Sequence, residues 1–253
     1  MHPDSVAVTG FCTPDGLYQW HRMPMGIRNG PPHFQRCMNK IIVESGMQTC
    51  AGIFIDDLGS GGVDHTAAAA NLNTVMQALE DRHVLAGADK LGLGEESMAF
   101  LGYQLKAGEL HCDPAKTDAI SRLVPPETRS HLRAFLGLAG YYRHFIKGFA
   151  AIARPLYALL KETSLWSWGQ PEQVAFDVLK SSLCAAPVLK LPQPDRPYTL
   201  TTDYSALAIS AILEQKQEDA KDHVIAYASK CCSDAESKYG SSKGEFLAVV
   251  YGC

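Results

Sequence analysis

Residues 51–62 read AGIFIDDLGSGG and place two carboxylates side by side directly after an apolar run. Residues 53–55, IFI, favour a short strand, and the Gly/Ser cluster that follows favours a turn. Two like charges that are held close together and partly desolvated repel each other, so Asp56 and Asp57 need either a cation or open water beside them. A divalent metal site and the solvated tip of a hairpin are both possible, and the pair alone favours the hairpin tip.

The composition is that of an ordinary globular protein, with 46% hydrophobic and 20% charged residues among 253. No apolar run reaches about 18 residues, and the opening MHPDSVAVTG lacks the basic and apolar segments of a signal peptide. We therefore expect no membrane association and a cytoplasmic location. Eight cysteines without a C-x-x-C pair favour free thiols in a reducing compartment and argue against a zinc site.

The charge is unevenly distributed along the chain. A net charge of −4 gives no overall attraction to nucleic acid. Residues 113–161, however, contain eight Lys/Arg and three Asp/Glu. This excess is typical of a solvated helix face, and it is equally compatible with a surface that faces a phosphate backbone.

Hydrophobic periodicity and turn residues predict a mixture of short strands and amphipathic helices. The predicted elements are strands within 5–23 around a turn at 13–16, a helix that begins at 31–32, a strand at 54–57, a helix at 66–84, a strand at 98–105, a helix pair at 132–150, a helix at 172–183, a hairpin at 198–215, a strand at 223–230 and a final helix that contains Glu245. We expect Asp203 at the bend of the hairpin, and a break in the helix pair near Gly140 or Gly148.

The order of the motifs resembles one family. The motifs are YQWHRMPMGIRNGPPHFQRCM at 18–38, FIDD at 54–57, Lys90 ten residues before FLGY at 100–103, LRAFLGLAGYYRHFI at 132–146, TDYSALAISAIL at 202–213 and KGEFLAVV at 243–250. Together they resemble the pol polyprotein of gypsy-type LTR retrotransposons, in which a reverse transcriptase is joined to an RNase H. The resemblance covers essentially the whole chain.

The resemblance implies an α+β fold in three parts. Residues 1–105 would be a reverse transcriptase palm portion, with an antiparallel sheet and helices. Residues 106–168 would be a helical thumb or connection, and residues 169–253 the N-terminal portion of an RNase H-like α/β domain. The implied partners are an RNA template, a DNA primer, an RNA–DNA hybrid and a dNTP, and the sequence does not indicate an oligomeric state.

The same resemblance implies an RNA-directed DNA polymerase and a ribonuclease H, each of which uses two Mg²⁺ or Mn²⁺ ions. Asp56 and Asp57 match the metal-binding acids of the polymerase, and Asp56 is the stronger candidate for direct ligation. Asp203 and Glu245 match the first two metal-binding acids of the RNase H. Lys90 matches a lysine near the leaving phosphates, so these five residues are the candidate catalytic set.

The resemblance also implies a set of substrate-binding residues on the nucleotide, template and primer sides. They are Arg22, Gly26, Phe34, Gln35, Phe54, Ile55, Phe100, Leu101 and Gly102. Phe54 stands where the family often has Tyr, so a hydroxyl is lost there.

Several departures from the family pattern bear on activity. Gly30 and Tyr204 each replace a usual Ala, and Val8 replaces a Lys. A further polymerase Asp is expected upstream of this sequence, and further RNase H carboxylates downstream of it. We therefore expect both sites to be incomplete in this chain and the chain alone to be inactive. The alternative is a non-catalytic retroelement remnant that at most binds nucleic acid. For the parent element, a virus-like particle or the nucleus are further locations.

Overall fold

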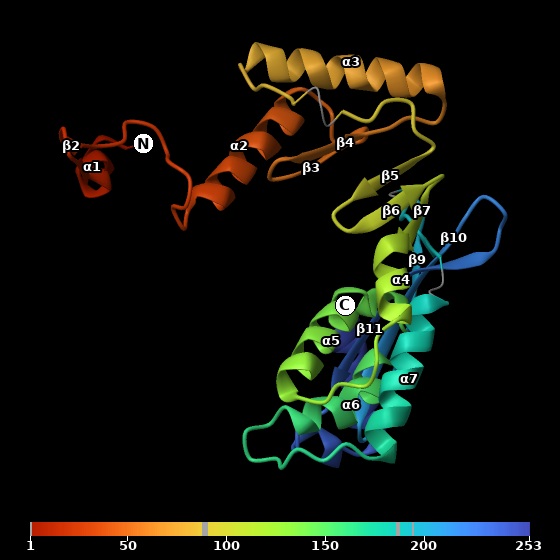
Figure 1. Cartoon of the computed structure of the whole chain (residues 1–253). Helices are drawn as coiled ribbons and strands as arrows, with labels where there is room; N and C mark the ends of the chain where they lie inside the picture. Colours follow the sequence, from red (N-terminus) through yellow and green to blue (C-terminus); the bar gives the residue numbers. More distant parts are fainter. Residues whose placement is uncertain (1, 88–90, 186–187, 194) are drawn as a thin grey trace. The chain divides into compact units, whose positions relative to one another are not determined.

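A computed structural model describes residues 2–87, 91–185, 188–193 and 195–253 (Figure 1). The chain forms two compact units, Met1–Glu95 and Glu96–Cys253. No helix among the described residues has the length and apolar character needed to cross a membrane.

The first unit contains helices and two separate hairpins. Its elements are α1 (Pro3–Val6), a 3-10 turn (Ala7–Thr9), β1 (Phe11–Thr13), β2 (Gly16–Tyr18), α2 (Gly30–Glu44), β3 (Ala51–Phe54), β4 (Asp57–Ser60) and α3 (His65–Asp81). The β1–β2 hairpin confirms the predicted turn, with Thr13 paired to Gly16.

Residues 5–9, which we predicted to be strand, are helical instead. Pro3 lies in the first turn of α1, where its fixed φ suits a helix. The Thr9 hydroxyl donates to the Val6 carbonyl at 2.6 Å and accepts from the Trp20 amide at 3.0 Å. The bond to Val6 is local and favours a helical turn over an extended strand, and the bond from Trp20 ties this turn to the segment after β2.

A buried cluster between α2, α3 and the β3–β4 hairpin forms the core of the first unit. Its members are Met38, Ile41, Ile42, Met47, Val75, Ala78 and Leu79. Ile53 and Leu58 pack against it from the two strands of the hairpin. The predicted helical spacing of 38, 41 and 42 is thereby confirmed, and the cluster fixes the hairpin that carries Asp56 and Asp57.

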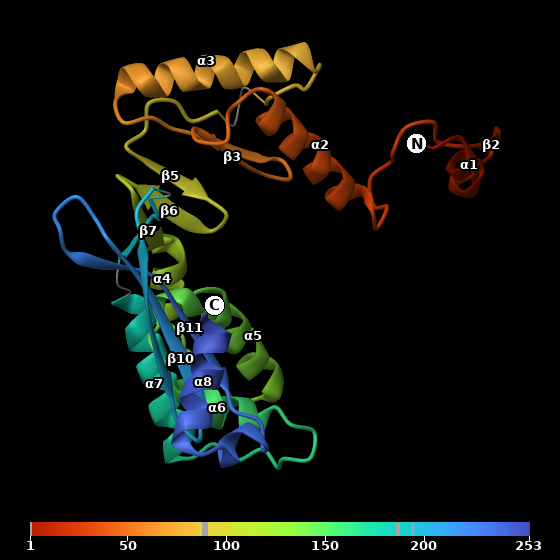
Figure 2. The ribbon, with the colours of Figure 1, turned by 180° about the vertical axis from the view of Figure 1, so that it is seen from behind.

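The second unit contains two antiparallel sheets and a helical layer. Its elements are β5 (Ser97–Phe100), β6 (Tyr103–Lys106), β7 (Glu109–Cys112), α4 (Pro114–Ser121), α5 (Arg129–Tyr141), a 3-10 turn (Arg143–Phe145), α6 (Phe149–Leu159), α7 (Gln170–Cys184), β8 (Leu189–Lys190), β9 (Tyr198–Tyr204), β10 (Ala208–Lys216), β11 (Asp222–Cys231), a 3-10 turn (Glu236–Lys238) and α8 (Ser241–Gly252). The strand orders are β5-β6-β7-β8 and β11-β10-β9. Figure 2 brings α8 to the front of the three-stranded sheet, where it contacts β9 and β10.

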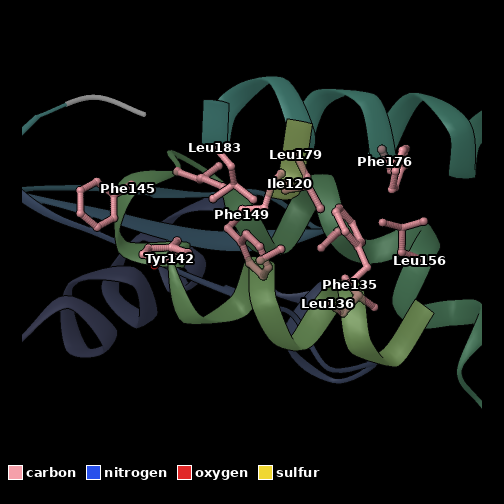
Figure 3. Close-up of a cluster of buried hydrophobic side chains, with 14 of the residues drawn as sticks. Ile120, Phe135, Leu136, Tyr142, Phe145, Phe149, Leu156, Phe176, Leu179 and Leu183 are labelled. Atoms are coloured by element: carbon pink, nitrogen blue, oxygen red, sulfur yellow. The ribbon is translucent and has the colours of Figure 1, made fainter. Parts of the chain in front are cut away.

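The core of the second unit lies among α4–α7 (Figure 3). Phe135 and Leu136 of α5 meet Leu156 of α6 and Phe176 of α7, and the Phe135 and Phe176 rings are 4.7 Å apart. The predicted helix pair is confirmed, with its break between α5 and α6.

Strand β8 closes the four-stranded sheet from far along the chain. Leu189 pairs with Leu110 and joins the buried core. The Lys190 ammonium lies 2.7 Å from a Glu109 carboxylate oxygen. This pairing and the core contacts of Tyr103 attach the sheet to the later helices, so the sheet lies in the same compact unit as those helices. The domain boundaries inferred from the sequence stay predictions.

Three further predicted strand positions differ from the structure. Residues 54–57 are not one strand, because β3 ends at Phe54 and β4 begins at Asp57. The predicted strand 98–105 is a hairpin, because Leu101 and Gly102 adopt positive φ angles of 49° and 70°. Asp203 lies inside β9, opposite Ser210, and not at a bend. The turn comes after it because the Ser205 hydroxyl accepts from the amides of Leu207 and Ala208.

Candidate functional site

The β3–β4 hairpin presents the paired carboxylates at a two-residue turn. Phe54 pairs with Asp57, so Ile55 and Asp56 form the turn itself. Ile55 has a φ of 53°, which is the left-handed region that a β-branched side chain rarely adopts. Asp56 and Asp57 are both exposed. Strain of this kind clusters at functional sites, where the surrounding structure holds it in place.

The Gln35 side chain holds this turn from α2. The Ile55 amide donates to Gln35 Oε1 at 2.5 Å, and Gln35 Nε2 donates to the Ile53 carbonyl at 3.1 Å. Nε2 also donates to Asn39 Oδ1 at 2.7 Å. Both amide hydrogens of Gln35 are thus used within the protein. The predicted contact of Gln35 with substrate stays a prediction, and the structure adds a second role that no sequence signal indicated.

The donor set at this turn fits a hard divalent cation. Mg²⁺ takes oxygen ligands and is commonly held by one or two carboxylates together with waters and substrate phosphates. Asp56 and Asp57 offer such oxygens on the exposed turn. No group of three or more His, Cys, Asp or Glu side chains within the described part of the chain lies in an arrangement that could hold a metal ion.

Other predicted substrate residues lie before α2, within α2 and at the end of β3. Phe34 is 36% exposed and Phe54 51% exposed, so both rings are open to a ligand. Arg22 is exposed in the segment that leads into α2. Gly26 has a φ of 86°, and a Cβ placed there would meet nothing within 4 Å. Lys90 lies outside the described residues.

A second feature is the turn between β5 and β6, which carries the predicted residues Phe100, Leu101 and Gly102. The Tyr141 hydroxyl donates to the Leu101 carbonyl, and the Tyr142 hydroxyl donates to the Gly102 carbonyl at 2.7 Å. A Cβ on Gly102 would lie 3.1 Å from the Tyr141 oxygen. The end of α5 therefore fixes this turn.

The tyrosines at this turn form an aromatic cluster. The Tyr103 and Tyr141 rings stack at 5.1 Å, and the Tyr103 hydroxyl donates to the Tyr141 carbonyl at 3.3 Å. Burial raises the pKa of Tyr103 and of Tyr142 to about 12, so both hydroxyls remain protonated donors near neutral pH. The sequence indicated Tyr142 only as part of the apolar stripe, because a donor to a turn 40 residues away leaves no local signal.

The remaining acidic candidates lie on β9 and α8. Asp203 and Glu245 are both exposed. Each lies next in sequence to one of two residues that contact each other, Tyr204 and Gly244. Tyr204, next to Asp203, directs its ring at Gly244, next to Glu245: a Cβ on Gly244 would lie 2.1 Å from the ring. The backbones that carry the two acids therefore meet at this contact.

The basic region at 113–161 is mostly open to solvent. Its exposed cationic residues are Lys116, Arg122, Arg133, Arg143, Lys147, Arg154 and Lys161. Arg129 is half-buried, and its guanidinium donates to the carbonyls of Leu159 and Ser164. Seven of the eight cationic side chains in this region are therefore accessible to an anionic partner.

Two family models match the chain. Residues 3–105 match the family described as reverse transcriptase (RNA-dependent DNA polymerase), and residues 168–253 match the RNase H-like domain found in reverse transcriptase. The two matches occur in the order that the sequence motifs predicted.

Curated relatives are retroelement polyproteins. The Pol polyprotein from transposon 297 of Drosophila melanogaster is 34% identical over 252 residues, which cover 99% of this chain and 23% of the relative. The Pol polyprotein from transposon gypsy of the same species is 32% identical over 255 residues, covering 96% and 24%. The chain spans about a quarter of the length of these relatives.

Solved structures with the same fold come from a foamy virus. Its protease-reverse transcriptase in complex with an RNA/DNA hybrid has a TM-score of 0.83 and 20% identity, covering 99% of this chain and 34% of the viral chain. A structure of the same viral protein with double-stranded DNA has a TM-score of 0.82 and 21% identity, covering 98% and 43%. These likenesses confirm the predicted α+β fold.

Proposed function

The chain belongs to the reverse transcriptase family of retrotransposon Pol polyproteins, with an RNase H-like domain after the polymerase part, and we propose that it contributes to two nucleic-acid reactions. The first is RNA-directed DNA synthesis at the β3–β4 hairpin. The second is cleavage of the RNA strand of an RNA–DNA hybrid at the junction of β9 and α8.

The observation that carries the polymerase proposal is the strained Ile55 turn, which presents Asp56 and Asp57 and is held by Gln35. We assign both carboxylates to binding Mg²⁺ or Mn²⁺. When bound, two such ions activate the attacking oxygen and stabilise charge on the transferring and leaving phosphates. The protein's part is to keep the two carboxylates together at a fixed turn.

The substrates follow from the residues around this hairpin. The transfer joins a primer 3′-oxygen to the α-phosphate of a dNTP and releases pyrophosphate. We assign Arg22, Gly26 and Phe34 to the nucleotide and template side. The positive φ of Gly26 leaves a backbone without a side chain, which a nucleotide could approach closely.

We assign the primer side to a second group of residues. Phe54 and Ile55 would lie near the primer end, and the turn with Phe100, Leu101 and Gly102 would grip the primer backbone. Support for the grip comes from the hydroxyls of Tyr141 and Tyr142, which hold that turn at both carbonyls. Lys90, by resemblance, would lie near the leaving pyrophosphate.

For the ribonuclease reaction we assign Asp203 and Glu245 to binding the metal ions. Both are exposed, and both adjoin the contact of Tyr204 with Gly244. Their carboxylate oxygens are of the kind that Mg²⁺ and Mn²⁺ prefer. The cleavage breaks a phosphodiester bond of the RNA strand by addition of water.

A second candidate function is hybrid binding without catalysis, which the exposed basic side chains of residues 113–161 favour. Lys and Arg that contact phosphates release counterions, so binding of this kind weakens steeply with salt. We propose that the isolated 253-residue chain binds a hybrid and does not synthesise DNA by itself.

Primer extension on an RNA template, with Mg²⁺ or Mn²⁺, tests the catalytic proposals. The chain is compared with Asp56→Asn and with Asp15→Asn, a control on the exposed β1–β2 turn. Synthesis that is lost only in Asp56→Asn would establish the polymerase site and would refute inactivity of the isolated chain. No synthesis from any of the three would support inactivity.

Hybrid binding at several salt concentrations tests the second function. Arg133→Gln with Lys147→Gln should weaken binding and make it less dependent on salt, by about one unit of the log–log slope per lost phosphate contact. Lys221→Gln, on the exposed β10–β11 turn, should change neither. Equal binding by all the variants would exclude the basic region as the binding surface.

A further inference from the structure

The Tyr204 ring leaves no room for a side chain at Gly244. An ideal Cβ on Gly244 would lie 2.1, 2.2 and 2.5 Å from three atoms of the Tyr204 ring. Real Cβ atoms do not approach other heavy atoms this closely, so only glycine can occupy position 244 while the ring stays in place. Tyr204 stands where the resembling family usually has Ala.

The ring cannot easily move aside, because its hydroxyl is held. It donates to the Glu236 carbonyl at 2.6 Å, with the Tyr239 carbonyl at 3.4 Å. The Glu236 side chain is itself fixed by the Lys230 ammonium at 2.8 Å and the Ser233 amide at 2.7 Å. Tyr204 therefore joins β9 to the segment that immediately precedes α8.

Small residues continue along the face of α8 that meets β9. Gly244 and Ala248 are buried on α8, and a Cβ on Gly252 would lie 2.9 Å from Leu200 and 3.1 Å from Thr202. Small residues four apart thus face alternate residues of β9. Position 244 leaves less room for a Cβ than position 252, so α8 can lie this close to Tyr204 only because residue 244 has no side chain.

We infer that Tyr204 and Gly244 are a matched pair of positioning residues that set Glu245 of α8 relative to Asp203 of β9. This role rests on the ribonuclease function proposed above. Asp203 precedes the ring, and Glu245 follows the glycine, so a shift of α8 at this contact moves one acid relative to the other. Both carboxylates are open to solvent.

The inference predicts a suppressor relationship between the two positions. Gly244→Ala must displace either the ring or α8. Tyr204→Ala removes the ring and allows α8 to settle against a small side chain. The Mn²⁺ affinity and the Tm of the double variant should therefore lie closer to those of the unaltered chain than the values of Gly244→Ala do, although the double variant carries one more substitution. Tyr204→Phe keeps the ring and removes only the hydrogen bond of the hydroxyl. It should therefore change the Mn²⁺ affinity and the Tm less than Tyr204→Ala does.

The experiment titrates Mn²⁺ into the full 253-residue chain and measures its binding by NMR. Mn²⁺ bound between the acids broadens the backbone NMR signals of Asp203 and Glu245, and the concentration at half-broadening measures affinity. We expect Gly244→Ala to raise this concentration about tenfold or more, as loss of outer positioning groups commonly does. The double variant should return to within about threefold of the unaltered chain. Gly137→Ala on α5, where a Cβ would meet nothing within 4 Å, is the matched control.

Thermal unfolding of the same variants distinguishes a loss of packing between Tyr204 and Gly244 from a displacement of the two acids. Gly244→Ala should lower the Tm by roughly 5 °C, and the double variant should recover part of that loss. If the unaltered chain binds Mn²⁺ at both signals and Gly244→Ala binds it equally well, the positioning role is refuted. If the unaltered chain shows no broadening, the proposed metal site fails, and the positioning role fails with it. In that outcome, recovery of Tm in the double variant would still establish the contact.

Discussion

Gln35 holds Ile55 in a left-handed conformation: the Ile55 amide, at a φ of 53°, donates to Gln35 Oε1 at 2.5 Å. The helix α2 thereby fixes the turn residue that precedes Asp56. A strained backbone persists only where its surroundings hold it, and here one side chain from 20 positions earlier does so.

Replacing Gln35 by Ala should therefore release the turn. The change leaves the Ile55 amide and the Ile53 carbonyl without their partner, which should cost about 1–3 kcal/mol of local stability. Hydrogen–deuterium exchange at Ile55 should accelerate accordingly. Asn39→Ala, which removes a different partner of Gln35, should leave Ile55 protected. Unchanged exchange in Gln35→Ala would mean that other contacts hold the turn.

Gly102 should tolerate a side chain much less well than Gly108. Both have positive φ, of 70° and 75°, so an alanine is strained at either position. Only at Gly102 would the new Cβ also meet Tyr141, at 3.1 Å. Gly102→Ala should thus lower the free energy of unfolding by about 1–3 kcal/mol, and by more than Gly108→Ala. Urea unfolding of the two variants measures the difference, and equal losses would show that Tyr141 yields without cost.

The protonated Tyr142 hydroxyl should stabilise the folded protein, and this contribution should be lost at alkaline pH. Burial raises its pKa from 10.0 to about 12 in the folded protein. The unfolded chain loses this proton first, so the contribution is complete below pH 10 and is lost as the pH rises through about 12. Tyr142→Phe should reduce this alkaline loss in thermal melts, and Tyr157→Phe, an exposed tyrosine, should not. An unaltered alkaline profile in Tyr142→Phe would contradict the assignment.

Glu236 should make the second unit sensitive to acid. Its hydrogen bond with Lys230, assisted by the Ser233 amide, lowers its pKa from 4.5 to about 2. A lowered carboxyl pKa stabilises the fold above 4.5, and this contribution disappears as the pH falls through about 2. Glu236→Gln should make the Tm less dependent on pH between 4.5 and about 2. A Tm profile as steep as that of the unaltered chain would assign the acid sensitivity to other carboxylates.

The helices could be predicted because their information is local. In α5 the buried positions recur every three or four residues, and in α2 Pro31 and Pro32 indicate the first turn. The hairpin at FLGY is implied by the family resemblance but not by the apolar run around it, because the tyrosines that hold the turn come 40 residues later.

Only part of the candidate site could be predicted, for the same reason. The carboxylate pair of Asp56 and Asp57 is visible in the sequence, and so is its place in a hairpin. The support from Gln35 is not visible, since it depends on how α2 packs over β3. Likewise the sequence shows that Tyr204 departs from the family pattern, but its fit to Gly244 depends on a contact across 40 positions.

The pairing of β8 with β7 has a consequence for synthesis on the ribosome. Lys190 and Glu109 are 81 positions apart, and translation at about 5–20 residues per second separates them by about 4–16 seconds. During that interval the β7 edge has emerged while its partner strand does not yet exist. Exposed strand edges recruit other chains, so nascent copies on one polysome are the partners that β7 meets first. A chaperone that covers this edge for a few seconds would raise the yield of folded protein.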